Sequence, residues 1–320
     1  MIKFDTYVLN NGNKIPAVGL GTWDPANPRG AFLATRCALE AGYRHLDCAS
    51  LYGNEELVGQ AIFEFLQSHP DVARDDLFVT TKVWNHLHDA KDIEWSLNES
   101  LRKLGLDYVD LYLLHYPIAT EKDGQYQEKK GQNGKYVVNK ALTEHSEPTW
   151  QAMEALVQEG KTKAIGVSNW SINRLERLLS FANITPAVNQ IEIHPFFPNN
   201  RLVAFCLGHG ILPQAYSPLG SQVRVSRPCG LVLESKELQL IAKNSGLQLS
   251  QLLLAWGLKR GYAVLPKSFT PKRIEENLHP PTLTDENFNA VQRIAAKHCT
   301  RLVDISNEYD YDNFWDDQSD

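Results

Sequence analysis

Four polar side chains of this 320-residue chain have the types that a proton-transfer site needs. Asp47, Tyr52, Lys82 and His115 offer a carboxylate, a phenol, an ammonium and an imidazole. A phenol is a weak acid, with an unperturbed pKa of about 10. It can protonate a developing alkoxide if a nearby ammonium lowers its pKa and a carboxylate holds that ammonium in place. Tyr52 is therefore predicted to be a general acid, activated by Lys82 and Asp47, with His115 as an orienting imidazole.

These residues lie where predicted strands end. Asp47 is near the carboxyl end of one strand, and Tyr52 is on the loop beside it. Lys82 and His115 close two further strands. In a parallel barrel such strand ends share one rim, so we expect all four side chains in one site. Taken singly, Asp47 would be a helix cap and Lys82 a solvated charge, so the prediction depends on the combination.

The strands are predicted from short apolar runs that alternate with stretches of helical periodicity. The runs lie at 18–21, 44–47, 77–82, 109–115, 163–168, 187–191, 211–215 and 262–266. The helical stretches include 93–104, 150–159, 172–179 and 247–258. Eight strands that alternate with helices predict an α/β fold, a closed (β/α)8 TIM barrel. The competing doubly wound dinucleotide fold is less well supported, because Gly19-Leu-Gly21 lacks the third glycine of that motif.

Three segments are expected outside the regular repeats of a single domain over residues 1–320. The turn pair Asn11-Gly12 predicts an N-terminal β-hairpin cap over 1–18. A polar stretch predicts a long loop over 118–148, after the fourth strand, as a lid or insertion. Trp315 and Phe314 stand among acids in the C-terminal tail, 300–320, which is therefore expected to fold back over the active rim.

Composition argues against several classes of protein. The net charge of −6 provides no basic footprint for nucleic acid or an anionic membrane. The chain starts without a signal-peptide pattern and has no apolar run long enough to span a bilayer, so a cytoplasmic protein is expected. Its five cysteines lack C-x-x-C spacing, which argues against a disulfide framework and a zinc site.

Three stretches resemble the long signatures of the aldo-keto reductase family: 42–55, 106–115 with Pro117, and 265–277. The resemblance covers nearly the whole chain. Within the family, the sequence looks most like fungal and yeast reductases of aldoses and short hydroxyaldehydes. It implies a (β/α)8 barrel that reduces carbonyls with NADPH. It also implies a catalytic tetrad at Asp47, Tyr52, Lys82 and His115. The family includes channel-associated and lens-structural members, so a non-enzymatic role stays open.

The cofactor site is expected on the same rim. Lys267, Ser268, Thr270 and Arg273 place two cations and two hydroxyls around a helix start, which predicts a local anion site suited to a ribose 2′-phosphate. The family resemblance extends the predicted NADPH or NADP+ contacts to Thr22, Trp23, Asp47, Ser168, Asn169, Gln190, Tyr216, Ser217, Leu219, Ser221, Lys267, Ser268, Thr270, Arg273, Glu276 and Asn277.

The substrate is expected to be a small-molecule carbonyl compound. Its predicted contacts form a largely apolar wall: Trp23, Leu51, Tyr52, Trp84, His115 and Tyr116. This wall and the acidic tail favour a small neutral aldehyde or aldose. Uronic acids, met by Arg224 or Arg227, and bulky ketones are the alternatives. The oligomeric state is not determined by the sequence, and a monomer or weak dimer is expected.

A metal-dependent barrel hydrolase is the competing enzyme class. His45, Asp47, His115 and His194 would be its ligands. None of these four residues belongs to an H-x-H or H-E-x-x-H motif, and the ammonium of Lys82 would repel a cation. We therefore expect no metal.

Overall fold

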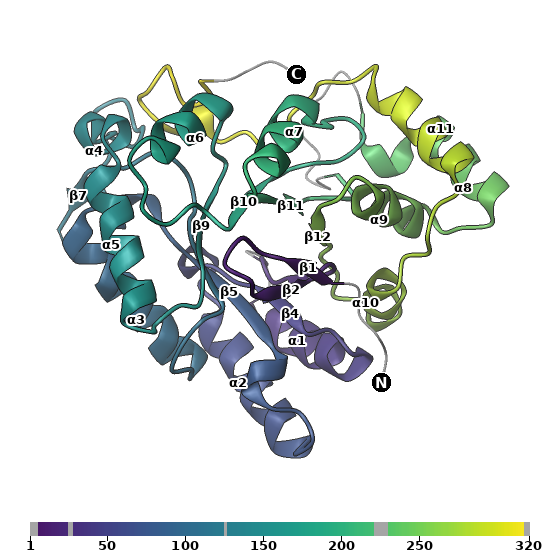
Figure 1. Cartoon of the computed structure of the whole chain (residues 1–320), viewed down its shortest axis with the longest axis horizontal. Coiled ribbons are helices and arrows are strands. Elements are labelled where there is room, and N and C mark those ends of the chain that lie inside the picture. Colours follow the sequence, from purple (N-terminus) through teal and green to yellow (C-terminus); the bar gives the residue numbers. More distant parts are fainter. Residues whose placement is uncertain (1–5, 25–27, 125–126, 221–229, 317–320) are drawn as a thin grey trace.

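A sheet of eight parallel strands, surrounded by helices, forms the centre of the protein (Figure 1). The computed structural model describes residues 6–24, 28–124, 127–220 and 230–316. The strands of this sheet are β3 (Leu20–Gly21), β4 (His45–Asp47), β5 (Phe78–Val83), β6 (Leu111–Leu114), β9 (Ile165–Ser168), β10 (Val188–Glu192), β11 (Leu212–Tyr216) and β12 (Ala263–Leu265). They lie in sequence order, from β3 through to β12, so each pairs with its neighbour along the chain.

The sheet closes on itself between its first and last strands. Val18 forms a parallel bridge with Val264. The amide of Gly19 donates to the carbonyl of Val264 at 2.9 Å, and the amide of Gly21 donates to that of Pro266 at 3.0 Å. All eight predicted strands are confirmed within a few residues, and so is the (β/α)8 barrel.

The helices cover the outside of the barrel. They are α1 (Pro28–Ala41), α2 (Glu55–Ser68), α3 (Ala90–Leu104), α4 (Lys140–Glu144), α5 (Glu147–Gln158), α6 (Ile172–Leu179), α7 (Asn200–Gly208), α8 (Lys236–Ser245), α9 (Leu249–Lys259), α10 (Pro271–Leu278) and α11 (Asp285–Ala295). The four predicted helical stretches match α3, α5, α6 and α9.

Helix α3 shows how the sequence determines such an element. Ile93, Leu97, Leu101 and Leu104 recur at helical spacing and are buried against the barrel. The Asp89 side chain caps the start by accepting from the amide of Lys91. Gly105 ends the helix with φ 65°, a left-handed conformation that glycine adopts without strain.

The N-terminal hairpin crosses one end of the barrel (Figure 1). Its strands, β1 (Thr6–Val8) and β2 (Lys14–Pro16), pair antiparallel. Ile15 is fully buried, in a cluster with barrel residues such as Phe78 and Leu111. The predicted cap is therefore confirmed over its described residues, and it covers the end opposite the strands' carboxyl ends.

The long loop and the tail meet above the active rim. The loop contains α4 and a small hairpin of β7 (Lys122–Asp123) and β8 (Gln127–Glu128). The amide of Tyr136 donates to the carbonyl of Glu308 at 2.8 Å, and the amide of Asp310 donates back to Tyr136 at 3.0 Å. Tyr309 and Phe314 are buried in a cluster with loop residues. The tail thus folds back as predicted.

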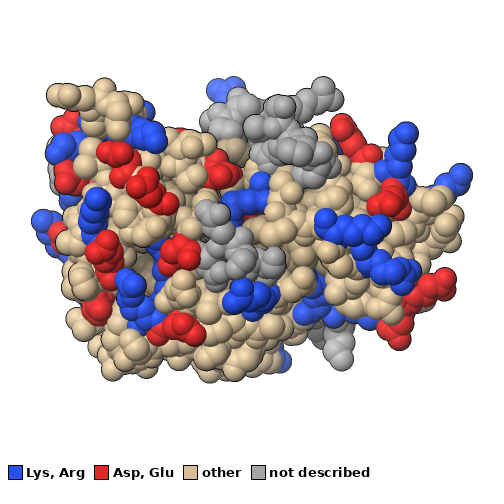
Figure 2. All heavy atoms as spheres, turned by 90° about the horizontal axis from the view of Figure 1, so that it is seen from above, with Lys and Arg blue, Asp and Glu red and all other residues tan. Residues whose placement is uncertain are grey.

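Acidic and basic side chains are interspersed on the face shown in Figure 2. This distribution accords with the small net charge of the chain. Among the described residues, no helix has both the length and the apolar character needed to cross a bilayer.

Candidate active site

Lys82 occupies the centre of the predicted catalytic group. It comes from β5 and is fully buried. Its Nζ donates to Asp47 Oδ2 at 2.8 Å, to the Cys48 carbonyl at 2.8 Å and to the Tyr52 hydroxyl at 3.2 Å. An ammonium has three N–H donors, so each has one acceptor here. A buried charge is tolerated when it is paired and hydrogen-bonded in this way, and the geometry fixes the ammonium at the phenol.

Tyr52 is the last residue of a short helical turn, Ser50–Tyr52, which follows β4 after Cys48 and Ala49. Burial and the nearby carboxylate of Asp47 raise the pKa of this phenol well above its usual value. The prediction from sequence was a lowered pKa, because it included the charge of Lys82 but not the desolvation of the buried phenol. At neutral pH the phenol is therefore protonated. Since Lys82 donates to the phenol oxygen, the hydroxyl proton is free to point elsewhere.

His115 follows β6, and its ring lies near the phenol. The ring centroids of His115 and Tyr52 are 5.8 Å apart, at an interplanar angle of 76°. Burial, then the charge of Lys82, lowers the pKa of His115 well below its usual value. The imidazole is therefore neutral and can donate one hydrogen bond. Its Nδ1 is buried and has no hydrogen-bond partner among the residues that the structure describes.

A row of buried polar side chains continues from Asp47 across the barrel. Gln190 Nε2 donates to Asp47 Oδ1 at 2.7 Å and to Gln214 Oε1 at 2.6 Å. Gln214 Nε2 lies 3.3 Å from His45 Nε2, and His45 Nδ1 lies 3.1 Å from the Pro16 carbonyl. Both carboxylate oxygens of Asp47 thus accept a hydrogen bond, one from Lys82 and one from Gln190. The sequence predicted Gln190 only as a cofactor contact and missed Gln214, although both come from strand positions that face inward.

Asn169 links the ends of three strands. Its Nδ2 donates to the His115 carbonyl at 2.9 Å and to Ser168 Oγ at 3.1 Å. Its Oδ1 accepts from the Tyr216 hydroxyl at 2.8 Å. Asn169 and Ser217 both have positive φ, 64° and 48°, which is uncommon for residues other than glycine and recurs at functional sites. The predicted cofactor residues Ser168, Asn169 and Tyr216 are therefore brought together.

Thr22 and Leu219 are two further predicted cofactor residues that the structure describes. Thr22 is buried, with its hydroxyl donating to the Asp47 carbonyl at 2.8 Å. Leu219 is half-buried and packs against the barrel core. Ser221 lies outside the described residues.

The predicted anion site surrounds the start of α10. Lys267 and Arg273 are exposed, and neither forms an ion pair with a described residue. The amide of Thr270 donates to Ser268 Oγ at 3.1 Å, which shapes the turn before the helix. Glu276 pairs loosely with Lys272 at 3.8 Å. Asn277 is buried, and its Oδ1 has no partner among the described residues.

The predicted substrate wall is partly assembled. The Trp84 and His115 rings are 5.0 Å apart, and Trp84 and Tyr116 are 5.8 Å apart, both edge to face. Trp23 and Leu51 are 42% and 46% exposed, so they stand at the mouth of the site. Lys267 Nζ lies 5.6 Å from the centroid of the Trp23 ring, which joins this mouth to the anion site.

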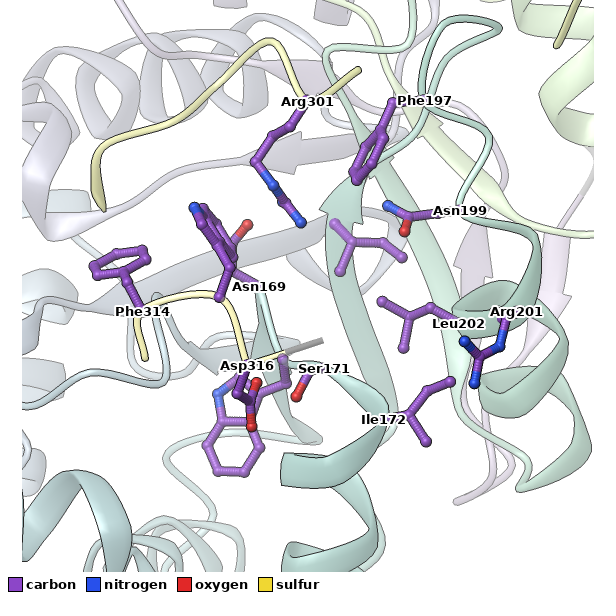
Figure 3. A pocket seen from close by; sticks show the side chains of 13 residues that line it. Asn169, Ser171, Ile172, Phe197, Asn199, Arg201, Leu202, Arg301, Phe314 and Asp316 are labelled. Carbon is purple, nitrogen blue, oxygen red and sulfur yellow. The ribbon is translucent and has the colours of Figure 1, made fainter. Parts of the chain in front are cut away.

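A pocket lined in part by Asn169, which donates to the His115 carbonyl, is closed on one side by the tail (Figure 3). Arg301 points into it from the start of the tail. Its guanidinium lies 3.6 Å from the centroid of the Trp315 ring and 4.6 Å from that of Phe197. Asp316 is tied to α6 by Arg174 at 3.1 Å. The sequence predicted that the tail folds back but missed Arg301 and Arg174. Arg224 and Arg227 lie outside the described residues.

Two of the alternative metal ligands, His45 and His194, face other partners. His45 faces Pro16 and Gln214, and His194 Nε2 lies 2.8 Å from Glu192 Oε1. Over residues 6–24, 28–124, 127–220 and 230–316, no group of three or more His, Cys, Asp or Glu side chains could hold a metal ion.

Comparison with known proteins gives consistent matches along the chain. A profile of the Aldo/keto reductase family matches residues 17–296. Glycerol 2-dehydrogenase (NADP(+)) of Hypocrea jecorina is 55% identical over 314 residues, 98% of this chain and 98% of that protein. Aldehyde reductase YPR1 of Saccharomyces cerevisiae is 40% identical over 313 residues, 94% of each chain. The crystal structure of a Bombyx mori aldo-keto reductase in complex with NADP superposes with a TM-score of 0.84 at 36% identity, covering 98% of this chain and 99% of that one.

Proposed function

This chain belongs to the aldo/keto reductase family, and from that premise we propose that it interconverts a small neutral carbonyl compound and its alcohol with NADP(H), using Tyr52 as general acid. The enzyme class and the cofactor follow from the family and the NADP-dependent relatives. The observation that carries the proposal is the contact of a buried, paired Lys82 with the Tyr52 hydroxyl at 3.2 Å.

The mechanism follows from the protonation states. NADPH, when bound, supplies hydride to the carbonyl carbon. Tyr52 holds a proton at its hydroxyl and transfers it to the carbonyl oxygen as negative charge develops there. Lys82 stabilises the phenolate that remains, and Asp47 keeps the ammonium in place. Neutral His115 can donate a hydrogen bond to the same oxygen and so orient it. In the alcohol-oxidising direction, the phenolate of Tyr52, stabilised by Lys82, would take up the alcohol proton, so this direction needs Tyr52 to lose its own proton first.

The residues present fit NADPH. Two exposed cations, Lys267 and Arg273, without ion pairs to described residues, suit a ribose 2′-phosphate in a chain of net charge −6. The unpartnered, buried Oδ1 of Asn277 suits an amino donor such as that of adenine. Tyr216, Asn169 and Ser168 form a fixed polar edge that suits the nicotinamide end. Thr270, Ser217 and Leu219 are further proposed contacts of the cofactor.

The substrate proposal rests on the apolar rings around His115 and on the name of one relative. The Trp84 and Tyr116 rings pack against His115, and Phe314 of the tail packs on Tyr116, so the surroundings of His115 are largely apolar. The relative from Hypocrea jecorina is named as a glycerol 2-dehydrogenase, which acts on a three-carbon polyol. We therefore favour small polyols and the corresponding hydroxyaldehydes or hydroxyketones over uronic acids or bulky ketones.

Turnover by the purified protein tests the proposal directly. Oxidation of NADPH should be measured with glyceraldehyde, dihydroxyacetone, xylose, glucuronate and a steroid ketone, and reduction of NADP+ with glycerol. We expect the highest kcat/KM for a three-carbon compound. A preference for glucuronate would favour an arginine clamp for carboxylates, and absence of turnover with all of them would favour a non-enzymatic role. The single domain over 1–320, the cytoplasmic location and the monomer or weak dimer stay predictions.

A further inference from the structure

The indole of Trp84 is packed against catalytic His115. The ring centroids lie 5.0 Å apart at 81°, and Trp84 meets Tyr116 at 5.8 Å and 87°. Only 8% of Trp84 is exposed. Trp84 directly follows β5, the strand that carries Lys82. Rotation of this indole would therefore change the space in which the reacting carbonyl must lie.

A carboxylate from the long loop holds the indole. Trp84 Nε1 donates to Glu128 Oε2 at 2.8 Å, across 44 residues of sequence. The other oxygen, Oε1, accepts from the Thr120 hydroxyl at 2.8 Å. A buried indole N–H needs an acceptor, and a carboxylate held at both oxygens has little freedom to rotate. The orientation of the indole thus depends on Glu128.

The loop backbone fixes Glu128 in turn. Glu128 belongs to β8 and pairs with Lys122 of β7. The amide of Lys129 donates to the Glu121 carbonyl at 2.9 Å, and the amide of Thr120 donates to the Asn85 carbonyl at 3.1 Å. Asn85 is the residue after Trp84, and its side chain donates to the Tyr309 hydroxyl of the tail at 3.0 Å. The loop, the tail and the rim of β5 therefore form one connected unit.

We propose that Glu128 is a positioning residue that locks the Trp84 indole beside His115 and thereby keeps the substrate pocket small. The loop over 118–148 then determines specificity through one hydrogen bond, rather than acting only as a cover. This role deepens the proposed function and depends on it for its kinetic consequence. The structural link itself, from carboxylate to indole, does not depend on it.

The first experiment reads the indole N–H without any turnover. The NMR signal of the Trp84 Nε1–H is identified as the one absent from the Trp84→Phe variant. In the wild-type protein this proton should exchange slowly with solvent. Glu128→Ala should speed its exchange at least about tenfold, because the buried acceptor is lost. Glu128→Gln should stay close to wild type, since its amide oxygen can accept from the indole and its amide NH2 can donate to Thr120. Equal exchange rates of the Trp84 Nε1 proton in the wild type, Glu128→Ala and Glu128→Gln would overturn the proposal.

The second experiment measures kcat/KM for glyceraldehyde and for bulkier 4-nitrobenzaldehyde. Glu128→Ala should lower the value for glyceraldehyde about tenfold and leave that for 4-nitrobenzaldehyde within about threefold, because the freed indole widens the pocket. Trp84→Phe, which keeps a ring but removes the donor, should shift selectivity in the same direction. In the double variant, which combines Glu128→Ala with Trp84→Phe, kcat/KM for glyceraldehyde should be no lower than in the more impaired of the two single variants. Glu128→Gln should restore most of the selectivity.

Several outcomes contradict the proposal and can be told apart. Equal decreases in kcat/KM for both aldehydes, or additive decreases in the double variant, would mean that Glu128 acts only on the stability of the loop. If Glu128→Ala does not fold, Trp84→Phe still tests the same hydrogen bond from the donor side. If the wild-type protein reduces neither aldehyde, the proposed function fails while the exchange measurement still decides the link between Glu128 and Trp84.

Discussion

The Nζ atom of Lys82 lies 3.2 Å from the hydroxyl of Tyr52 and has two other acceptors, Asp47 and the Cys48 carbonyl. This arrangement does not ionise the phenol, because burial and Asp47 raise its pKa. Instead, the ammonium is already positioned to stabilise the phenolate that forms when the proton is transferred. A raised pKa keeps the acid loaded at neutral pH, and the fixed ammonium lowers the energy of the transition state into which charge moves.

Removing the proton donor should abolish most turnover and leave cofactor binding intact. Tyr52→Phe keeps the ring and its contact with His115 but has no hydroxyl. General acid catalysis contributes about 10²–10⁴-fold, so kcat should fall by that amount while the Kd for NADPH stays near wild type. Steady-state kinetics and a fluorescence titration measure the two quantities. A variant that kept its kcat would show that another group protonates the carbonyl.

Breaking the buried ion pair from one side should cost stability. Lys82→Met leaves the carboxylate of Asp47 buried with Gln190 as its one remaining donor among the described residues, and such changes cost about 3–5 kcal/mol. Combining it with Asp47→Asn removes the stranded charge, so the double variant should be more stable than Lys82→Met alone. Urea unfolding of the three proteins gives the free energies. A double variant less stable than Lys82→Met would mean that the carboxylate is stabilised mainly by other contacts.

Coenzyme choice should depend on Arg273. If its guanidinium meets the 2′-phosphate, Arg273→Ala should weaken NADPH binding by about 1.5–3 kcal/mol, the scale of a charged hydrogen bond, and barely change NADH binding. Lys272→Ala is the matched control, because Lys272 is the adjacent residue, is exposed and pairs loosely with Glu276. Calorimetric titration with both coenzymes measures the effect. Equal weakening of NADPH and NADH would show that Arg273 only supports the loop.

Two buried histidines should make the fold sensitive to acid. Burial lowers the pKa of His45 to about 4 and that of His88 to about 3, whereas an unfolded histidine has a pKa of about 6.5. Below about pH 6.5 the unfolded chain therefore binds more protons than the folded one, and stability falls as the pH falls. Each histidine should contribute a loss of about 2 kcal/mol between pH 7 and pH 5.

Unfolding at both pH values separates this effect from packing. Whatever its stability at pH 7, His88→Asn should lose about 2 kcal/mol less than the wild type on going to pH 5. The comparison uses the difference between pH values, so a general destabilisation by the substitution cancels. An equal loss in both proteins would mean that His88 takes up its proton while folded.

The sequence predicted the parts of this protein that depend on local pattern and strand order. Alternating apolar runs predicted the barrel, and the residues that end its strands predicted where Asp47, Lys82 and His115 meet. Burial cannot be counted from sequence, so the direction of the Tyr52 pKa shift was missed. Pairings across long separations were missed for a related reason, because Tyr136 and Tyr309, or Trp84 and Glu128, show no shared pattern along the chain.

The tail should control the substrate pocket more than it stabilises the barrel. Tyr309 and Phe314 are 1% and 2% exposed, and Phe314 packs on Tyr116 with ring centroids 5.8 Å apart. Ending the chain before Asn307 removes both rings and uncovers Trp84 and Tyr116, while the backbone contacts of Leu302 and Val303 with Glu192 remain. We expect KM for the three-carbon substrates to rise at least about tenfold, with kcat less affected.

A chain that ends after Asp316 is the matched control, because it keeps Tyr309, Phe314 and the contact of Asp316 with Arg174. This control should retain the wild-type KM. The melting temperature of the longer deletion should fall by only a few degrees, about the effect of losing 1 kcal/mol in a protein of this size. The tail deletion should also narrow the gap in kcat/KM between glyceraldehyde and the steroid ketone, because the rings that exclude a large substrate are gone. An unchanged KM with a large fall in melting temperature would make the tail a structural brace for the barrel instead of a wall of the pocket.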